Sequence, residues 1–185
     1  TKAHIWHQVV SIRASLQVVT PMDSARLLKH LRGQFQLDWD GHHGGSHWSR
    51  VRRNGLLLAK ENGANATVVE LFAFFHDSRR ENEHRDPAHG LRGAQLAQQL
   101  RGDFFHASDV EMDTLIEACC LHSDGHTEAD ITIQTCWDAD RLDLGRVGIK
   151  PDPRYLCTSQ AKRQDVLEAA YARSLTWLKN RYGSR

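Results

Sequence analysis

Apolar residues recur at helical spacing along most of this chain, whereas the strict alternation of a half-buried strand is hard to find. Glycine and Asp-Pro positions separate the periodic segments, and we find no internal repeat. The pattern therefore predicts an all-α protein. The expected helices run over residues 23–32, 46–58, 68–75, 87–100, 108–122, 130–144 and 159–181.

The segment 68–75 is apolar around most of its circumference, which is typical of a helix buried on all sides. It ends in the doublet His76-Asp77, which places two titratable side chains where the preceding residues indicate burial. We therefore expect this helix to be central and the doublet to lie inside the fold.

Capping signals mark several helix starts. Ser46 is a plausible N-cap, and Asp130 is another. Thr67 to Glu70 and Ser108 to Glu111 both match the capping box, in which the first side chain and the fourth satisfy each other's backbone N–H groups. Asp86 precedes a proline, which favours a helix start at that point.

The chain of 185 residues has the size of one domain. We expect this domain to span 21–185. Residues 1–20 are only weakly amphipathic and precede Pro21, so they are either an appended extension or an over-long start of the domain.

A formal net charge of +1 gives no strong nucleic-acid signal and no drive toward an anionic membrane surface. No run is long enough to span a membrane, and the first residues do not resemble a secretory signal, so a cytoplasmic location is expected. The four cysteines form no CxxC pair and are interpreted as reduced core residues.

Polar side chains interrupt several of the predicted apolar faces. They are His47, the doublet His76-Asp77, His89, His122 and Asp140. An unpaired buried carboxylate costs several kcal/mol, so two of them imply a cation or a dense hydrogen-bond network. Mixed imidazole and carboxylate ligands suit a divalent ion with open positions: manganese, iron, nickel, cobalt or magnesium. A metal-free hydrogen-bonded network is the alternative.

Taken in order, His47, His76-Asp77 and Asp140 resemble the signature of the HD superfamily of metal-dependent phosphohydrolases. Residues 139–142 also resemble its final Ala-Asp-Arg-Leu segment. The resemblance runs from about 46 to 145 and implies a single-domain HD-type helical bundle. It implies further that His47, His76, Asp77 and Asp140 bind a divalent ion.

Some two-metal branches of that superfamily add histidines between the doublet and the last aspartate. His89 and His122 stand in this interval and are candidates for a second ion or for a phosphate contact. Arg79 and Arg80 follow the doublet where several nucleotidase branches carry a glutamate. Guanidinium groups suit phosphate oxygens, so these two arginines are catalytic candidates, together with Asp77 as the group that orients or deprotonates water.

Other residues near the motif have weaker signals. Asp143 lies one turn beyond Asp140, and Asp124 lies in a small-residue segment after His122, so both are candidates for substrate binding. His42 and His43 belong to a glycine-rich loop and are expected to be solvated.

The resemblance implies a metal-dependent phosphohydrolase in which activated water attacks the phosphorus of a small phosphate ester, and a nucleotide is the expected ester. Two alternatives stay open: a metal-containing module that senses a nucleotide without turnover, and a di-iron oxygenase of the same superfamily. The expected partner is a small molecule, and a homo-oligomer is possible.

Overall fold

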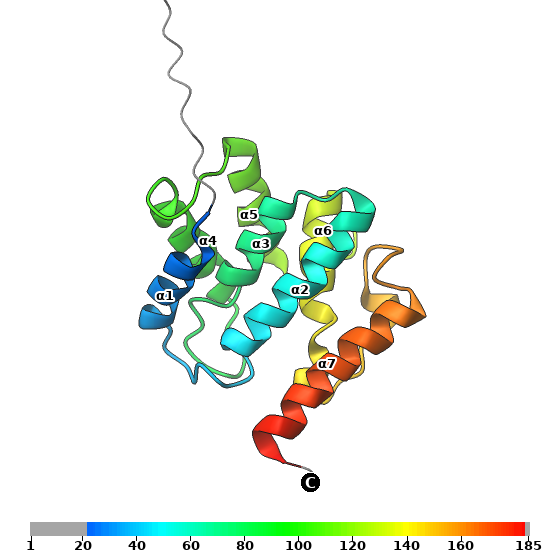
Figure 1. Ribbon diagram of the computed structural model, residues 1–185. Helices are drawn as coiled ribbons and strands as arrows, with labels where there is room; N and C mark the ends of the chain where they lie inside the picture. Colours follow the sequence, from blue (N-terminus) through cyan, green and yellow to red (C-terminus); the bar gives the residue numbers. More distant parts are fainter. Residues whose placement is uncertain (1–21, 184–185) are drawn as a thin grey trace, which may run out of the picture.

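The computed structural model describes residues 22–183, so the prediction about residues 1–20 lies outside the described residues. Within that range the chain is helical, as the pattern predicts, and holds no named strand (Figure 1). The α-helices are α1 (Ser24–Gln34), α2 (Gly45–Asn62), α3 (Ala66–Phe75), α4 (His89–Leu100), α5 (Asp109–Leu121), α6 (Ile131–Arg141) and α7 (Gln164–Tyr182). Two short 3₁₀ helices, η1 (Leu144–Val147) and η2 (Pro153–Tyr155), lie between α6 and α7.

Some of the predicted helix starts are confirmed. The capping box of Ser108 and Glu111 begins α5, and the Asp130 side chain accepts the backbone N–H of Thr132 at the start of α6. At α1 the N-cap is Asp23, whose carboxylate accepts from the N–H of Arg26.

Three predicted starts are wrong. The N-cap of α2 is Gly44, not Ser46. At α3 the cap is Asn65, which accepts the N–H groups of Thr67 and Val68, so the box predicted from Thr67 does not form. The Asp86 carboxylate contacts Arg92 instead of capping, and α4 begins only at His89.

The last helix starts later than its periodicity predicts. Asp138 of α6 is buried, and its carboxylate accepts the backbone N–H groups of Cys157 and Thr158. These bonds hold residues 157–158 in an irregular loop against α6, so α7 begins only at Gln164.

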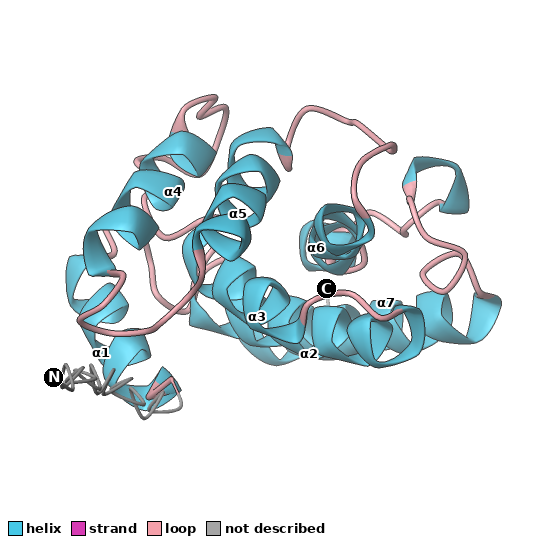
Figure 2. Cartoon of the chain, turned by 90° about the horizontal axis from the view of Figure 1, so that it is seen from above, coloured by secondary structure: helices cyan, strands magenta, loops and turns pink. Residues whose placement is uncertain are grey.

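The hydrophobic core surrounds α3, which packs against α2, α4, α5 and α6. Figure 2 shows α3 between these helices, with α4 and α5 on one side and α6 and α7 on the other. The buried side chains of α3 include Phe72 and Phe75, both fully buried. Because α3 ends among its neighbours, the residues that follow it begin inside the protein.

Two glycines of α4 allow this helix to approach closely enough for its first residue, His89, to reach the end of α3. A Cβ atom on Gly90 would lie 2.0 Å from the carbonyl oxygen of Cys119, and one on Gly93 would lie 2.1 Å from that of Phe75. Any larger residue would push α4 away from α5 and α3. The position of His89 therefore depends on both glycines.

No helix among residues 22–183 is sufficiently long and apolar to cross a membrane.

Candidate metal centre

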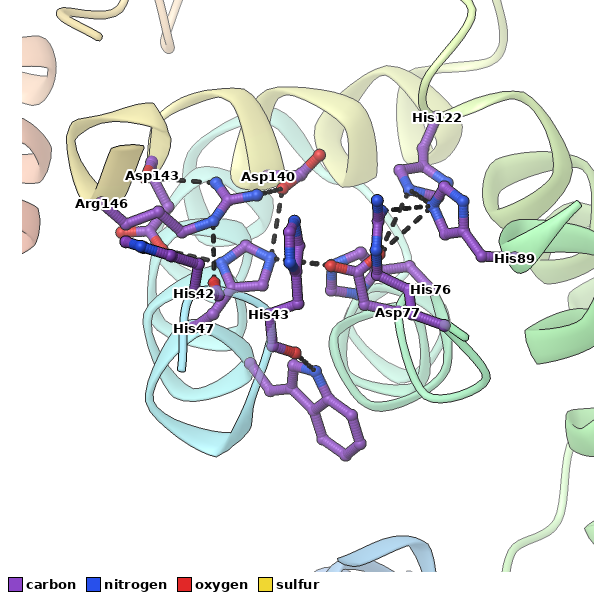
Figure 3. Close-up of polar contacts among 12 residues, drawn as sticks. His42, His43, His47, His76, Asp77, His89, His122, Asp140, Asp143 and Arg146 are labelled. Atoms are coloured by element: carbon purple, nitrogen blue, oxygen red, sulfur yellow. Dashed lines mark hydrogen bonds and ion pairs between the residues drawn. The ribbon is translucent and has the colours of Figure 1, made fainter. Parts of the chain in front are cut away.

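Four side chains named by the motif converge at the end of α3 (Figure 3). His47 comes from the first turn of α2, His76 and Asp77 follow α3, and Asp140 lies in the last turn of α6. The first three are buried, and the side chain of Asp140 is 17% exposed. The core therefore shields His47, His76 and Asp77 from solvent, and Asp140 lies on the side of the cluster that solvent can reach.

The ligand atoms of this cluster face one another. Nε2 of His47 lies 3.1 Å from Nε2 of His76, 3.6 Å from Oδ2 of Asp77 and 3.4 Å from Oδ1 of Asp140. The nitrogen and oxygen atoms of His47, His76 and Asp77 all lie within 4.8 Å of one another, a spacing that one ion can bridge.

Hydrogen bonds behind the rings fix which nitrogen carries the proton. Nδ1 of His76 donates to the carbonyl oxygen of Phe72 at 3.0 Å, and Nδ1 of His47 donates to the carboxylate of Asp143 at 2.7 Å. Since these acceptors take the Nδ1 protons, the neutral rings carry lone pairs on Nε2. Both lone pairs point into the cluster, as in metal-bound histidines.

The charges of the cluster agree with this arrangement. Burial lowers the pKa of His76 to about 3, so its ring is neutral near pH 7. Burial alone would raise the pKa of Asp77 and of Asp140, but the neighbouring histidines, and Arg146 in the case of Asp140, hold both pKa values well below the usual one. The cluster therefore combines ionised carboxylates with the neutral imidazole of His76.

A cation fits this set of residues. Oδ1 of Asp140 is buried and has no hydrogen-bond partner among the residues that the structure describes. A buried acceptor left in this state costs about 1–3 kcal/mol, and the two facing lone pairs of His47 and His76 repel each other. A divalent ion between these atoms would satisfy all of them, and nitrogen and oxygen donors are the ligands that first-row divalent metals accept.

A second group of ligand atoms adjoins the first through Asp77. Oδ1 of Asp77 lies 3.2 Å from Nε2 of His89 and 3.8 Å from Nε2 of His122, and these two nitrogens are 2.9 Å apart. Nδ1 of each ring donates to a carbonyl oxygen, of Asp86 and Cys119 respectively. The three residues could also hold an ion. The structure thus brings both histidines, which the sequence offered as candidates for a second ion or a phosphate contact, beside the doublet.

Arg80 enters this second group. Its guanidinium Nη1 lies 3.3 Å from Oδ1 of Asp77 and 3.2 Å from Nε2 of His89, and the side chain is almost fully buried. Burial alone would lower the pKa of His122, but its hydrogen bond to Asp77 raises that pKa. Positive charge from the protein is therefore available at the Oδ1 side of Asp77.

Asp143 takes a different position from the one expected. It lies behind His47, where its carboxylate accepts from Nδ1 of His47, from the Arg50 guanidinium and from the Ser174 hydroxyl. The side chain is buried, and both oxygens are engaged. Contact with a substrate hydroxyl is thereby prevented, and Asp143 instead orients the imidazole of His47.

His43 and Arg146 are two further residues of the centre that sequence reasoning missed. The expectation that His43 is solvated is wrong: the ring is buried, and Nδ1 lies 2.6 Å from the Glu83 carboxylate. Its ring centroid lies 6.4 Å from that of His47. His43 lies in the turn before α2, outside its helical period, so no spacing in the sequence indicated it.

Arg146 lies on η1, with Nη2 at 3.8 Å from Oδ1 of Asp140 and Nε donating to the carbonyl oxygen of His42. It lies outside the periodic pattern of α6, so no spacing in the sequence indicated it. Figure 3 shows the guanidinium of Arg146 next to Asp140, and the ring of His43 near His47.

Two expected site residues are not brought to the cluster. Arg79 extends toward α1, where its Nη1 lies 3.4 Å from the side-chain oxygen of Gln34. Asp124 is exposed in the turn after α5. Their contacts give no support to the catalytic role expected for Arg79 or to the substrate role expected for Asp124.

A cavity of about 730 Å³ opens beside Arg146, between η1 and the C-terminal half of α7. Its lining includes His42, Arg146, Val147, Leu178, Lys179 and Tyr182. The rings of His42 and Tyr182 are stacked, with centroids 5.5 Å apart. Among the described residues that line it there are two cations and no carboxylate, so the cavity suits an anion with an apolar or aromatic part.

Comparison with solved structures identifies the fold. A crystal structure described as a predicted HD superfamily hydrolase from an uncultured Thermotogales bacterium is similar over 85% of this chain and 90% of that one. The TM-score is 0.63 and the sequence identity is 22%. The chain therefore has the HD-domain fold. No family model matches the sequence, and no curated protein matches it significantly.

Proposed function

We propose that this protein is a metal-dependent phosphohydrolase whose substrate is a small phosphate ester, and that this ester is a nucleotide. The observation that carries the proposal is the convergence of His47, His76, Asp77 and Asp140 around a buried carboxylate oxygen without a hydrogen-bond partner in the described part of the chain. The HD-type fold and the hydrolase description of the similar structure are consistent with it.

The ligand set gives the centre its chemistry. A divalent ion bound there supplies a Lewis acid for the phosphoryl oxygen and lowers the pKa of water at the site. His47 and His76 present their Nε2 atoms to the site, and the carboxylate of Asp143 keeps the ring of His47 in its orientation. Asp77, between the two groups of ligands, accepts a hydrogen bond from the attacking water and orients it toward phosphorus.

His43 is the proposed acceptor of the proton of that water. Burial lowers the pKa of His43, although the nearby Asp77 opposes this effect, so the ring is a neutral base near pH 7. Its Nδ1 proton is donated to Glu83, which leaves Nε2 as the acceptor. The Glu83 carboxylate then stabilises the imidazolium that forms, as in other His-carboxylate pairs.

Arg146 and the cavity beside it are suited to the rest of the substrate. A buried guanidinium next to the centre stabilises the negative charge on the phosphoryl oxygens. From there the cavity continues along α7, where Lys179 can contact a further phosphate and the stacked His42 and Tyr182 can contact a base. This combination of cationic and aromatic groups favours a nucleotide over a simple alkyl phosphate.

The test combines metal analysis with a phosphate-release screen. The purified protein is analysed for bound metal and then assayed with Mn²⁺, Fe²⁺, Ni²⁺, Co²⁺ and Mg²⁺ against nucleotides, sugar phosphates and phosphodiesters. We expect the protein to hydrolyse at least one nucleotide. This activity should be lost when the metal is chelated, should return when the metal is added back, and should be absent from Asp77→Asn protein. Metal-loaded protein that cleaves nothing in the panel would overturn the proposal, and metal-dependent nucleotide binding without cleavage would indicate the sensing module instead.

A further inference from the structure

The two groups of candidate ligand atoms that meet at Asp77 differ in how many of their hydrogen-bonding and charge requirements the protein itself meets. Around His47, an oxygen of Asp140 lacks a hydrogen-bond partner within residues 22–183, and two imidazole lone pairs face each other at 3.1 Å. Around His89, the Nε2 atoms of His89 and His122 also face each other, at 2.9 Å, but there the guanidinium of Arg80 donates to Oδ1 of Asp77 and to Nε2 of His89. The guanidinium of Arg146 stays 3.8 Å from Oδ1 of Asp140 in the first group, whereas the second group already has a cation within hydrogen-bond distance of its atoms.

The contacts of Arg80 are directed at the atoms that a second ion would use. Nη1 lies within hydrogen-bond distance of both Oδ1 of Asp77 and Nε2 of His89. Since Nδ1 of His89 donates to the carbonyl oxygen of Asp86, Nε2 of that ring is an acceptor, and the guanidinium is a suitable donor. A metal ion bound to these same two atoms would need the space that Nη1 occupies.

Arg80 is also held in this position from its other side. Nη2 donates to the carbonyl oxygen of His84 at 2.8 Å, and Nε donates to that of Asn82 at 3.4 Å. The loop after the doublet thus fixes the guanidinium plane, and the side chain is only 10% exposed. Most of its N–H groups are used inside the protein, so Arg80 acts as a fixed charge rather than as a mobile clamp for phosphate.

We infer that Arg80 takes the place of a second metal ion, so that each chain binds one divalent ion, at His47, His76, Asp77 and Asp140. The guanidinium neutralises the Oδ1 side of Asp77 while the Oδ2 side faces the ion site. Arg80 is therefore a positioning residue that acts through Asp77. This inference rests on the metal centre of the proposed function, but it makes a separate statement about the number of ions.

The experiment counts ions. Wild-type protein and Arg80→Gln protein are stripped with a chelator, reloaded with Mn²⁺, and analysed by calorimetry, elemental analysis and electron paramagnetic resonance. We expect one Mn²⁺ per chain with an isolated-ion spectrum for the wild type, and two per chain with a spin-coupled spectrum for Arg80→Gln. The neighbouring variant Arg79→Gln is the matched control and is expected to keep one ion.

A double variant locates the additional ion. Arg80→Gln combined with His89→Ala is expected to return to one Mn²⁺ per chain, because the second ion loses an imidazole ligand. Circular dichroism and thermal unfolding of each variant confirm that it is folded, and Arg80→Lys, which keeps a positive charge, provides a folded alternative expected to stay near one ion.

The outcomes separate the two proposals. Two ions in the wild type, or one ion in folded Arg80→Gln protein, would overturn the inference about Arg80. No bound Mn²⁺ in the wild type would overturn the metal centre itself, and with it the proposed function.

Discussion

Nε2 of His47 and Nε2 of His76 face each other at 3.1 Å, and the Nδ1 proton of each ring is already donated to an acceptor behind it. Two lone pairs at this distance are unfavourable unless a positive charge lies near both. The hydrogen bonds behind the rings therefore prepare the site for a cation.

Replacing one of these rings is expected to remove metal binding. His76→Gln protein should bind Mn²⁺ more than about 100-fold more weakly, because a first ligand is lost from a set of four. Titration calorimetry of the stripped protein measures the effect. His106→Ala, which changes an exposed histidine, is the control and should bind as the wild type does. Equal affinity in His76→Gln would contradict the ligand assignment.

Asp143→Asn is expected to weaken Mn²⁺ binding by about 10–100-fold, the usual cost of removing the carboxylate behind a ligating histidine. The asparagine can no longer accept the His47 proton as strongly, and Arg50 loses its charged partner. The control is Asp124→Asn, whose carboxylate is exposed. A direct role in substrate binding would instead change KM and leave metal affinity unaltered.

The metal-free protein should lose stability as the pH falls from about 6.5. The pKa of His76 is about 3 in the folded state and near 6.5 in the unfolded one, so the unfolded chain binds more protons over that window. This residue alone lowers the free energy of unfolding by up to roughly 1.4 kcal/mol per pH unit. His122, whose pKa is raised, contributes stability below pH 6.5 and partly offsets the loss.

Urea denaturation in the presence of a chelator, at a series of pH values between 7 and 4, measures this dependence. His76→Gln protein should show a flatter profile than the wild type over the same range. Parallel profiles for the two proteins would mean that His76 is not the group responsible.

The His43–Glu83 pair is predicted to act in catalysis. His43→Asn should reduce kcat by about 10²–10⁴-fold, the usual contribution of a general base, without reducing the bound metal. Glu83→Gln should have a smaller effect. Because the carboxylate raises the pKa of His43, its removal should move the acidic limb of the kcat profile to lower pH. Unchanged kcat in His43→Asn would exclude the role.

Lys179 is predicted to contribute to nucleotide affinity. Lys179→Ala should raise KM for a nucleotide several-fold and leave kcat nearly unchanged, because the residue lines the cavity away from the reacting phosphorus. Hydrolysis of methyl phosphate, which does not reach along α7, should not respond. Lys60→Ala on the exposed end of α2 is the matched control. An equal loss of activity toward the nucleotide and toward methyl phosphate would indicate that the cavity is not the binding site.

One error of the sequence interpretation arose where two side chains could cap the start of the same helix. At α3 both Asn65 and Thr67 could cap, and the structure uses Asn65 because Glu70 is engaged by Ser24 and Arg52. Near the end of α6, Asp138 and Asp140 look alike in the sequence. The first binds the backbone of the 157–158 loop, and the second faces His47.

The sequence by itself determined the helical class and named the four side chains that converge at the end of α3, because local periodicity and the order of a motif are written along the chain. Only the tertiary structure decided which charged side chains lie next to these four residues. Arg80, Arg146, His43 and Asp143 reach the centre through loops and neighbouring helices, and no spacing in the sequence encodes those distances. The balance of positive charge around Asp77 is thus a property of packing.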